Sequence, residues 1–343
     1  MPTPLPCARS VWIRILALTV LASPVVAASG VPAIHKDSAG TGAAAPVRLE
    51  CGPDTVTFRL GSKPVVTYRG GRGVLPAGVP EEYRRAGYLH PLVTPEGMVV
   101  SADHPKNHLH HHGVWTSWTK TRFEGRSPDF WNMGQKKGRV EMVGWLGARE
   151  TADGAEIEVL HRYVDLTATV PATVLMEGWR VRVPVTDAGK PHRIDLSIRQ
   201  TNVTDHPLLL PQYHYGGLGY RGLDAWDGAK NCGFRTSEGI TDRVAGNETR
   251  GRWCWIGGAV TNGGGTTATA GVVLLSHPSN PRFPESMRIH PTEPFFCWAP
   301  QQQGEFTLGP GAVHRMRYRL LLVDGPARPD AIEREWVEWS KVP

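Results

Sequence analysis

The segment His192-Arg193-Ile194-Asp195-Leu196-Ser197-Ile198-Arg199-Gln200-Thr201-Asn202 decides the fold class, because its apolar side chains return at every second position. Successive side chains of an extended chain point to opposite faces, so a period of two predicts a strand with one buried face. Similar short runs, mostly bounded by Gly, Pro or Asp, occupy Val47–Cys51, Thr55–Leu60, Pro64–Tyr68, Val140–Trp145, Glu156–Tyr163, Trp179–Val185, Ala270–Ser276 and Arg315–Val323. The sequence therefore predicts an all-β, mostly antiparallel domain, built as one large two-sheet sandwich.

One segment at the C-terminal end has helical spacing. After Pro329, Asp330 is a candidate cap, and Ile332, Trp336 and Trp339 recur on one face of a helix. We expect this helix, within residues 326–343, to pack on a β domain that spans residues 47–325. A propeller or solenoid is not expected, because no repeat with a period of about 20–50 residues is present.

The N-terminal residues predict export. Arg9 and Arg14 flank or precede an apolar run over residues 15–22, and Ala27 offers a small-residue cleavage site, so residues 1–27 are predicted to be a secretory signal peptide. Residues 28–46, rich in Ala, Gly and Ser, are expected to form a flexible leader. The apolar run is shorter than the roughly 20 residues of a membrane helix, so we expect an exported protein with no membrane partner after cleavage.

Charge and cysteine content narrow the class further. The net charge of +6 falls to +4 once the two arginines of the signal peptide are removed, and no Lys/Arg block stands out, so no nucleic-acid partner is expected. Four cysteines remain after cleavage, namely Cys51, Cys232, Cys254 and Cys297. An exported chain could pair them in two disulfides of open connectivity, or leave them as buried free thiols.

A histidine-rich segment, Asp103–Trp115, predicts a functional site. It holds five of the chain's 14 histidines, and imidazole is the side chain that most readily transfers protons or binds metals near neutral pH. If the segment is extended, His108, His110 and His112 share one face and could hold Zn²⁺ or Cu²⁺. The alternative is acid–base chemistry without a metal, in which Lys106 or Arg282 would stabilise an oxyanion.

Other residues suggest a sugar as the ligand, because aromatic rings, carboxylates and guanidinium groups suit its C–H faces and hydroxyl edges. The candidate substrate-binding residues are Trp115, Asp129, Trp131, Tyr213, Tyr215, Arg221, Asn280 and Arg282. The candidate catalytic residues are His108, His110, His111, His214, His277 and Lys106. His290 and Glu293 could reach the same site. The alternative is that the aromatic residues fill the core, that Asp129 caps a turn, and that the proline-rich loop from His277 to Arg282 is only structural.

Several ordered motifs resemble the bacterial family labelled methane oxygenase PmoA. They cover roughly residues 50–325 and comprise the histidines before Gly113-Val114-Trp115, Asp129-Phe130-Trp131, Tyr215–Gly219, Arg252-Trp253-Cys254 and His277–Arg282. His112 stands where that family is expected to have Arg. The label borrows from an integral membrane protein, so we do not expect methane oxidation from a chain without a membrane span.

A second set of motifs resembles the galactose mutarotase-like aldose epimerases. Its members are Asn107-His108-Leu109-His110, Thr201–Pro207 with Tyr213-His214-Tyr215, and Phe296–Gln301 with residues 308–311 and Tyr318. The resemblance implies a β-supersandwich in which His110 and His214 face a sugar. Ala299 stands where the epimerases have their general base, a Glu, so ordinary mutarotation is not expected.

The predicted function is an exported carbohydrate-active enzyme that uses its histidines for acid–base or metal-assisted lyase or hydrolase chemistry on a sugar or glycoside. A non-catalytic carbohydrate-binding protein on the same scaffold is the first alternative. A copper- or zinc-dependent oxidoreductase, as the PmoA label would suggest, is the second. In each case the expected partner is a carbohydrate or another polar small molecule.

Overall fold

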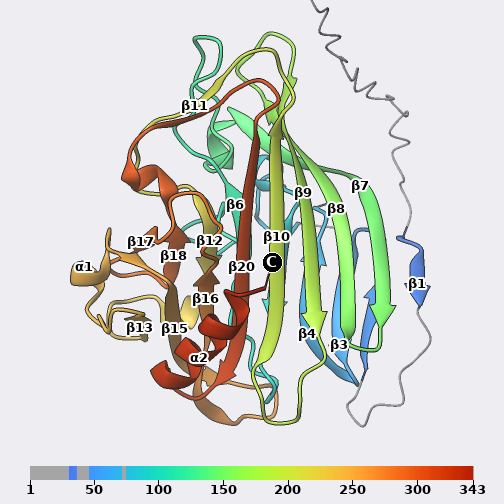
Figure 1. The fold of residues 1–343 in the computed structure, drawn as a ribbon, viewed down its shortest axis with the longest axis vertical. Helices are drawn as coiled ribbons and strands as arrows, with labels where there is room; N and C mark the ends of the chain where they lie inside the picture. Colours follow the sequence, from blue (N-terminus) through green and yellow to red (C-terminus); the bar gives the residue numbers. More distant parts are fainter. Residues whose placement is uncertain (1–30, 37–45, 72–74, 343) are drawn as a thin grey trace, which may run out of the picture.

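The computed structural model describes residues 31–36, 46–71 and 75–342, and within them two nine-stranded sheets face each other. Figure 1 shows the blue strands β3 and β4 behind the green strands of the first sheet. The first sheet contains, in spatial order, β1 (Ile34–Lys36), β7 (Gly138–Thr151), β8 (Gly154–Asp165), β9 (Ala172–Pro184), β10 (His192–Asn202), β20 (Val313–Asp324), β16 (Thr267–Ser276), β15 (Trp253–Thr261) and β13 (Cys232–Thr236).

The second sheet contains, in spatial order, β14 (Arg250–Gly251), β17 (Glu285–Ile289), β18 (Phe295–Trp298), β12 (Gly217–Arg221), β6 (Val114–Ser117), β5 (Tyr88–Leu92), β4 (Lys63–Arg69), β3 (Thr55–Leu60) and β2 (Val47–Cys51). A two-stranded sheet joins β11 (Leu208–Leu210) to β19 (Phe306–Leu308). The helices are α1 (Arg243–Gly246) and α2 (Pro329–Trp339), with 3₁₀ turns η1 (Glu81–Tyr83), η2 (Met133–Gln135), η3 (Asp224–Trp226) and η4 (Pro300–Gln303). Among the described residues no helix is long and apolar enough to cross a membrane.

The all-β prediction is confirmed, and β10 has the bounds that the alternating pattern predicts. Its apolar side chains Ile194, Leu196 and Ile198 are buried, whereas Ser197 and Arg199 between them are exposed. The strand pairs antiparallel to β9 on one side and to β20 on the other. Burial of one face of each sheet against the other forms the main core, because that is how a half-apolar sheet removes its apolar side chains from water.

Strand β1 lies within the segment that composition predicts to be a flexible leader. Ile34 pairs with Ala148 of β7 in parallel register and packs, half-buried, against the main core. An added edge strand gains backbone hydrogen bonds as well as this apolar contact, which explains why these three residues depart from the prediction. The predicted signal peptide and leader residues 28–30 and 37–45 lie outside the described residues.

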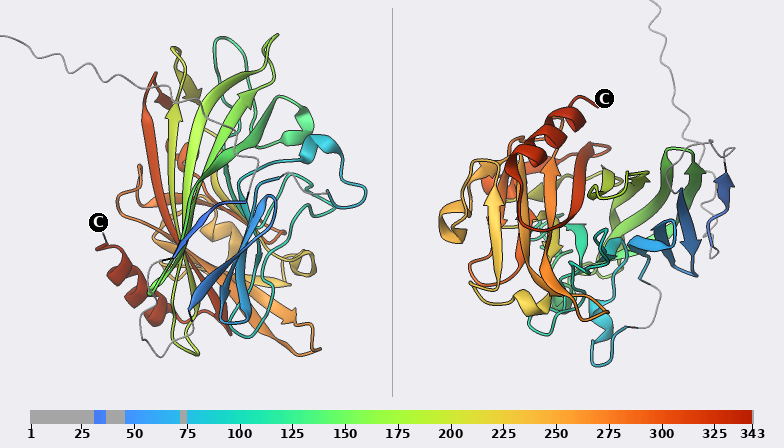
Figure 2. Two further views of the ribbon diagram at one scale, coloured as in Figure 1. Left: turned by 90° about the vertical axis from the view of Figure 1, so that its right-hand side faces the viewer. Right: turned by 90° about the horizontal axis from the view of Figure 1, so that it is seen from below.

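Helix α2 packs on the outer face of the first sheet, as predicted (Figure 2). Ile332 and Trp339 are buried there, and the indole N–H of Trp336 donates to the Ser276 carbonyl at 2.9 Å. Asp330 is not the cap, because Arg328 precedes the helix and Pro329 occupies its first turn. Pro suits that position since its missing N–H would have no partner there.

The four cysteines Cys51, Cys232, Cys254 and Cys297 are free thiols, so of the two alternatives the one without disulfides is confirmed. Burial raises the pKa of the Cys254 and Cys297 thiols far above the ordinary range. Both therefore behave as small apolar side chains within their strands.

A polar network crosses the core between the two sheets, centred on the fully buried Glu177 of β9. One carboxylate oxygen of Glu177 accepts hydrogen bonds from Thr116 at 2.7 Å, Tyr163 at 3.0 Å and Gln200 at 2.7 Å. The other lies 3.3 Å from Nδ1 of His161. Charged groups are tolerated in a core only when satisfied in this way.

Candidate functional site

The histidine-rich segment connects β5 to β6 as a series of turns, so it is not the extended run needed for the predicted alternation of side chains. The His108 N–H donates to the Pro105 carbonyl at 2.9 Å, and the His111 N–H donates to the His108 carbonyl at 2.8 Å. A further bond, from the His104 N–H to the His111 carbonyl at 3.0 Å, closes the loop. Residues three apart therefore lie together, and His108 stacks on His111 with ring centroids 4.7 Å apart.

The two ends of the segment meet in a hydrogen-bonded group around Asp103. This carboxylate lies 2.6 Å from Nδ1 of His112 and 3.0 Å from Nδ1 of His104, and it accepts a hydrogen bond from Tyr88 Oη at 3.0 Å. Burial lowers the pKa of His112 to about 3, despite its hydrogen bond to Asp103. Donors bonded to a zinc ion lie roughly 3.3 Å from each other, given bonds of about 2.0–2.1 Å in a tetrahedron, so the 2.6 Å contact is a hydrogen bond. The group holds the loop in place.

The middle of the segment carries a His–Glu pair. Nδ1 of His108 lies 3.1 Å from Oε1 of Glu293, and the His108 side chain remains 33% exposed. Arg221, which is fully buried, donates to Oε2 of Glu293 at 2.7 Å and to Asp227 at 2.8 Å. If the neutral His108 ring carries its proton on Nδ1, that proton faces the carboxylate and Nε2 is free to accept another.

The charge of Glu293 is secured by its neighbours. Partial burial alone would raise its pKa, but the hydrogen bond from His108 and the charges of His108, Arg221 and His290 lower that pKa to about 2. The carboxylate is thus ionised at neutral pH. It can stabilise a positive charge that develops on His108 when the imidazole takes a proton.

His290 presents the opposite tautomer near this pair. Its Nδ1 accepts the backbone N–H of Glu293 at 3.0 Å, so in the neutral ring the proton resides on Nε2. Burial lowers the pKa of His290, although the charge of Glu293 partly opposes this shift, and the ring is neutral at pH 7. The rings of His108 and His290 are 6.5 Å apart between centroids, which places a proton acceptor near a proton donor.

Metal binding by these histidines fits less well than proton transfer. The predicted set of His108, His110 and His112 does not converge, because His112 belongs to the Asp103 group. The donor atoms of His108, His111 and Glu293 do lie within 4.8 Å of one another. The two rings are, however, stacked only 16° from parallel, so their in-plane lone pairs do not point at one ion, and Arg221 already occupies the carboxylate. We therefore derive no step through zinc or copper.

His110 and His111 complete the histidine cluster as neutral rings. Burial, together with the nearby charge of His108, lowers the pKa of His110 to about 4. His111 is buried against Phe295 at 4.6 Å between ring centroids, and burial brings its pKa well below the usual range. These rings offer uncharged donors and acceptors beside the His108–Glu293 pair.

Four predicted substrate-binding residues have structural roles beneath the site. Trp115 and Trp131 are fully buried in a small aromatic cluster with Phe295, so neither presents an open face to a ligand. Asp129 is buried and accepts the backbone N–H groups of Trp131 at 2.9 Å and Asn132 at 2.8 Å, as a turn-capping carboxylate does. Arg221, the fourth, positions Glu293 from within the fold.

Tyr213, His214 and Tyr215 lie on the connection between β11 and β12. Tyr213 and His214 are in ring contact at 4.2 Å, and Tyr215 is half-buried against Trp131 at 5.3 Å. The exposed Lys106 and His214 make no described contact with His108. Lys106 is only two residues before His108 in the sequence, and His214 contacts the rings of Tyr213 and Tyr215. The structure gives neither residue a direct role beside His108.

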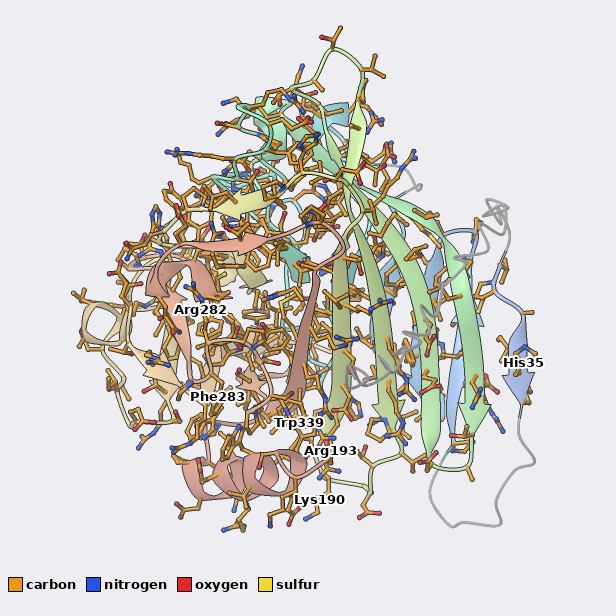
Figure 3. All side chains as sticks on the ribbon, turned by 45° about the horizontal axis from the view of Figure 1, so that its top comes forward. His35, Lys190, Arg193, Arg282, Phe283 and Trp339 are labelled. Atoms are coloured by element: carbon orange, nitrogen blue, oxygen red, sulfur yellow. The ribbon has the colours of Figure 1, made fainter. Side chains whose placement is uncertain are left out.

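The loop from His277 to Arg282 contacts helix α2, and Figure 3 labels Arg282 of this loop and Trp339 of the helix. His277 packs edge-to-face on Trp339 of α2 at 4.9 Å, and the Asn280 amide donates to Glu285 at 2.9 Å and to the Arg317 carbonyl at 2.9 Å. Arg282 donates to the carbonyls of residues 300, 304 and 305. These contacts fix the loop's own conformation and favour the alternative that the loop is structural, so its place in the wall of the site stays a prediction.

The comparisons with known proteins identify a family but no activity. No curated protein matches this sequence. A family described only as being of unknown function matches residues 55–337, which include every strand from β3 to β20 and the whole histidine cluster. That description carries neither the PmoA nor the epimerase label, so both resemblances stay predictions. The chain belongs to DUF6807, a family of unknown function.

Proposed function

We propose that the protein is an acid–base enzyme that acts on a sugar or glycoside, with His108 as its general base. The single observation that carries this proposal is the 3.1 Å contact between His108 Nδ1 and Glu293, which the buried Arg221 fixes from behind. A carboxylate in this position sets the tautomer of the imidazole and stabilises its protonated form.

The expected chemistry is proton transfer at Nε2 of His108. In a lyase reaction the ring takes a proton from a substrate carbon, a C=C bond forms as the neighbouring C–O bond breaks, and the imidazolium gives the proton to the leaving oxygen. In a hydrolase reaction the ring takes the proton from a water molecule, which attacks as the glycosidic C–O bond breaks, and the imidazolium again gives it to the leaving oxygen. The Nε2–H of His290 would stabilise negative charge on a substrate oxygen, since a neutral imidazole can serve as a hydrogen-bond donor. This sequence of transfers fits a lyase or a hydrolase.

A sugar is the substrate class that the surroundings favour. His110 and His290 are neutral rings, and the half-buried Tyr215 donates its hydroxyl to Asn132 at 3.2 Å. Uncharged donors and acceptors suit hydroxyl groups better than phosphates or sulfates, which would call for exposed cations.

A glycan panel tests this function. We would incubate the exported chain with plant and bacterial oligosaccharides and measure new reducing ends and unsaturated products. His108→Gln should lower turnover by about 10²–10⁴-fold, the usual contribution of general acid–base catalysis. His206→Gln is the matched control, because it removes another His–Glu pair, to Glu124 at 2.9 Å, from an exposed turn.

The outcome also separates the alternatives. Full turnover by His108→Gln would contradict the proposal. Binding of a glycan without turnover would favour the carbohydrate-binding alternative. Turnover that disappears with a chelator and returns with zinc or copper would favour a metal-dependent enzyme.

A further inference from the structure

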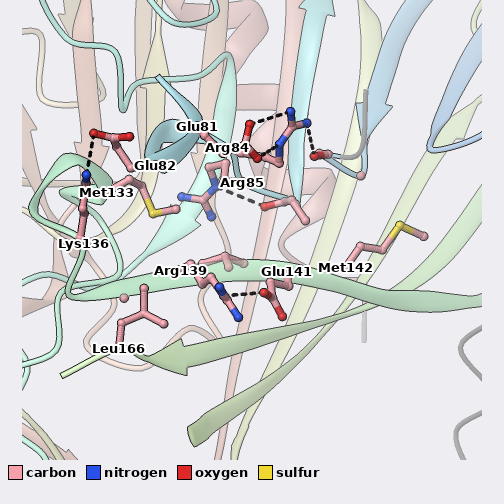
Figure 4. A pocket seen from close by; sticks show the side chains of 15 residues that line it. Glu81, Glu82, Arg84, Arg85, Met133, Lys136, Arg139, Glu141, Met142 and Leu166 are labelled. Carbon is pink, nitrogen blue, oxygen red and sulfur yellow. Dashed lines mark hydrogen bonds and ion pairs between the residues drawn. The ribbon is translucent and has the colours of Figure 1, made fainter. Parts of the chain in front are cut away.

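A second candidate binding site is a cavity of about 500 Å³ between η1, η2 and the beginning of β7 (Figure 4). Its apolar wall consists of side chains of Met133, Val140, Met142 and Leu166. Neither His108 nor Glu293 lines it. The volume lies within the range of small-molecule pockets, about 300–1,000 Å³.

Most of the charged groups of this cavity are paired with each other. Arg84 is paired with Glu81, Lys136 with Glu82 at 3.3 Å, and Arg139 with Glu141 at 2.5 Å. All six side chains are at least 27% exposed, so these pairs neutralise the mouth of the cavity without burying charge.

Arg85 is the exception. It is only 2% exposed, its Nε donates to the Ala86 carbonyl at 3.2 Å, and its Nη2 donates to the Thr116 carbonyl at 2.9 Å. Its Nη1 has no hydrogen-bond partner in the described part of the chain. The buried Glu177 carboxylate attracts the guanidinium but makes no ion pair with it at 4 Å or less. Figure 4 shows the guanidinium in the middle of the cavity.

We propose that this cavity binds a small monocarboxylate, whose carboxyl group pairs with Nη1 of Arg85. A buried guanidinium with an unsatisfied N–H is costly, and a charge-assisted hydrogen bond to a carboxylate removes that cost. A single negative charge fits because Arg85 is the one unpaired cation of the lining, whereas the carboxylates of Glu81, Glu82 and Glu141 would repel a dianion. The four apolar side chains would contact the body of the ligand.

Titration calorimetry with matched pairs of compounds tests this site in the full exported chain. The probes are acetate, butyrate and D-glucuronate, each compared with its uncharged counterpart acetamide, butyramide or D-glucose. At least one carboxylate should bind about tenfold or more tightly than its counterpart. Arg85→Gln should abolish that preference, because it removes the charge but keeps a polar side chain.

Arg139→Gln is the matched control, because it removes a paired and 45% exposed cation from the same cavity. Arg139→Gln should bind the carboxylate probes with an affinity within about twofold of the wild type, because an exposed ion pair contributes little. Equal binding of charged and uncharged probes, no binding of any carboxylate, or an equal loss in both variants would overturn the proposal. If Arg85→Gln does not fold, the Leu166→Trp variant is used to test the proposal. The larger side chain should fill the cavity and block carboxylate binding while Arg85 remains, and unaltered binding would again overturn the proposal.

Discussion

Replacement of Arg221 by Met gives a quantitative test of how the site is held together. Arg221 is fully buried, and its guanidinium donates to Glu293 at 2.7 Å, Asp227 at 2.8 Å and Asn107 at 3.1 Å. Removing one partner of a buried ion pair usually costs about 3–5 kcal/mol, because the remaining charge is stranded. Here the side chains of Glu293 and Asp227 are 13% and 36% exposed to solvent, so water can partly replace the guanidinium. We therefore expect a loss of about 2–3 kcal/mol in the free energy of unfolding at pH 7.

The pH dependence of this loss of stability is a second, independent test of the pairing between Arg221 and Glu293. Because the folded-state pKa of Glu293 is lowered from its ordinary 4.5 to about 2, its charge stabilises the fold fully above about pH 4.5 and loses this effect as the pH falls toward 2. Protonation of Glu293 ends its attraction to Arg221. The difference between the wild type and Arg221→Met should accordingly shrink on acidification.

Urea unfolding at pH 7 and at pH 3 measures both quantities. Arg221→Lys is the informative companion variant, because it keeps the charge but cannot hold two carboxylates through a planar fork. It should fall between the wild type and Arg221→Met. A cost below 1 kcal/mol for Arg221→Met, or the same cost at both pH values, would refute this account of the site.

Three further predictions concern the fold. Glu177→Gln should lower the free energy of unfolding by about 2–4 kcal/mol, measured with urea. The carboxylate of Glu177 only accepts hydrogen bonds, whereas the amide NH₂ group of Gln is a donor and would lie among the groups that now donate to Glu177. Trp339→Ala should cost about 3–5 kcal/mol by loosening α2 from the sheet, whereas the exposed Val337→Ala should change stability by less than about 0.5 kcal/mol. Burial alone would raise the pKa of Glu335, but the hydrogen bond from Arg193 outweighs this effect, and the pKa is lowered from 4.5. The ionised Glu335 therefore stabilises the fold above about pH 4.5, and this stabilisation is lost as the pH falls below that value. Glu335→Gln should thus flatten the acid side of the stability curve recorded by thermal unfolding.

Strands with alternating burial, including the short β2 and β3, were predictable from the sequence, whereas the short strands in the middle of the second sheet were not. The first sheet consists largely of strands such as β10, whose alternating pattern reports one buried face. In β6 and β12 every residue is buried, so no alternation exists to be seen. These two strands pair with each other in the middle of the second sheet, and they carry Trp115 and Arg221. The sequence therefore predicts the fold class but not the part of the sheet on which the site is built.

The site itself was predictable in composition and not in geometry. The density of histidines between residues 104 and 112 marks the segment, but an assumed extended chain gives the wrong neighbours for His108 and His112. The acid that orients His108 comes from far along the chain. Its approach depends on the pairing of β12 with β18, in which Arg221 lies opposite Phe295, two residues after Glu293. That register is a tertiary property that no local pattern encodes.

Aromatic residues were ambiguous for a physical reason. Trp115 and Trp131 have the chemistry of a sugar platform, but the same apolar area stabilises a core when it is buried. Only the packing distinguishes these uses, and here it places both rings beneath the histidines.

The state of the histidine rings tests the central claim most directly. A long-range ¹H–¹⁵N spectrum of the ¹⁵N-labelled protein reports which nitrogen of each neutral imidazole carries the proton. We expect His108 to be protonated on Nδ1, which faces Glu293, and His290 to be protonated on Nε2, with Glu293→Gln abolishing the preference at His108. A neutral His108 with its proton on Nε2, or a spectrum that Glu293→Gln leaves unchanged, would contradict the assignment of His108 as a base oriented by Glu293.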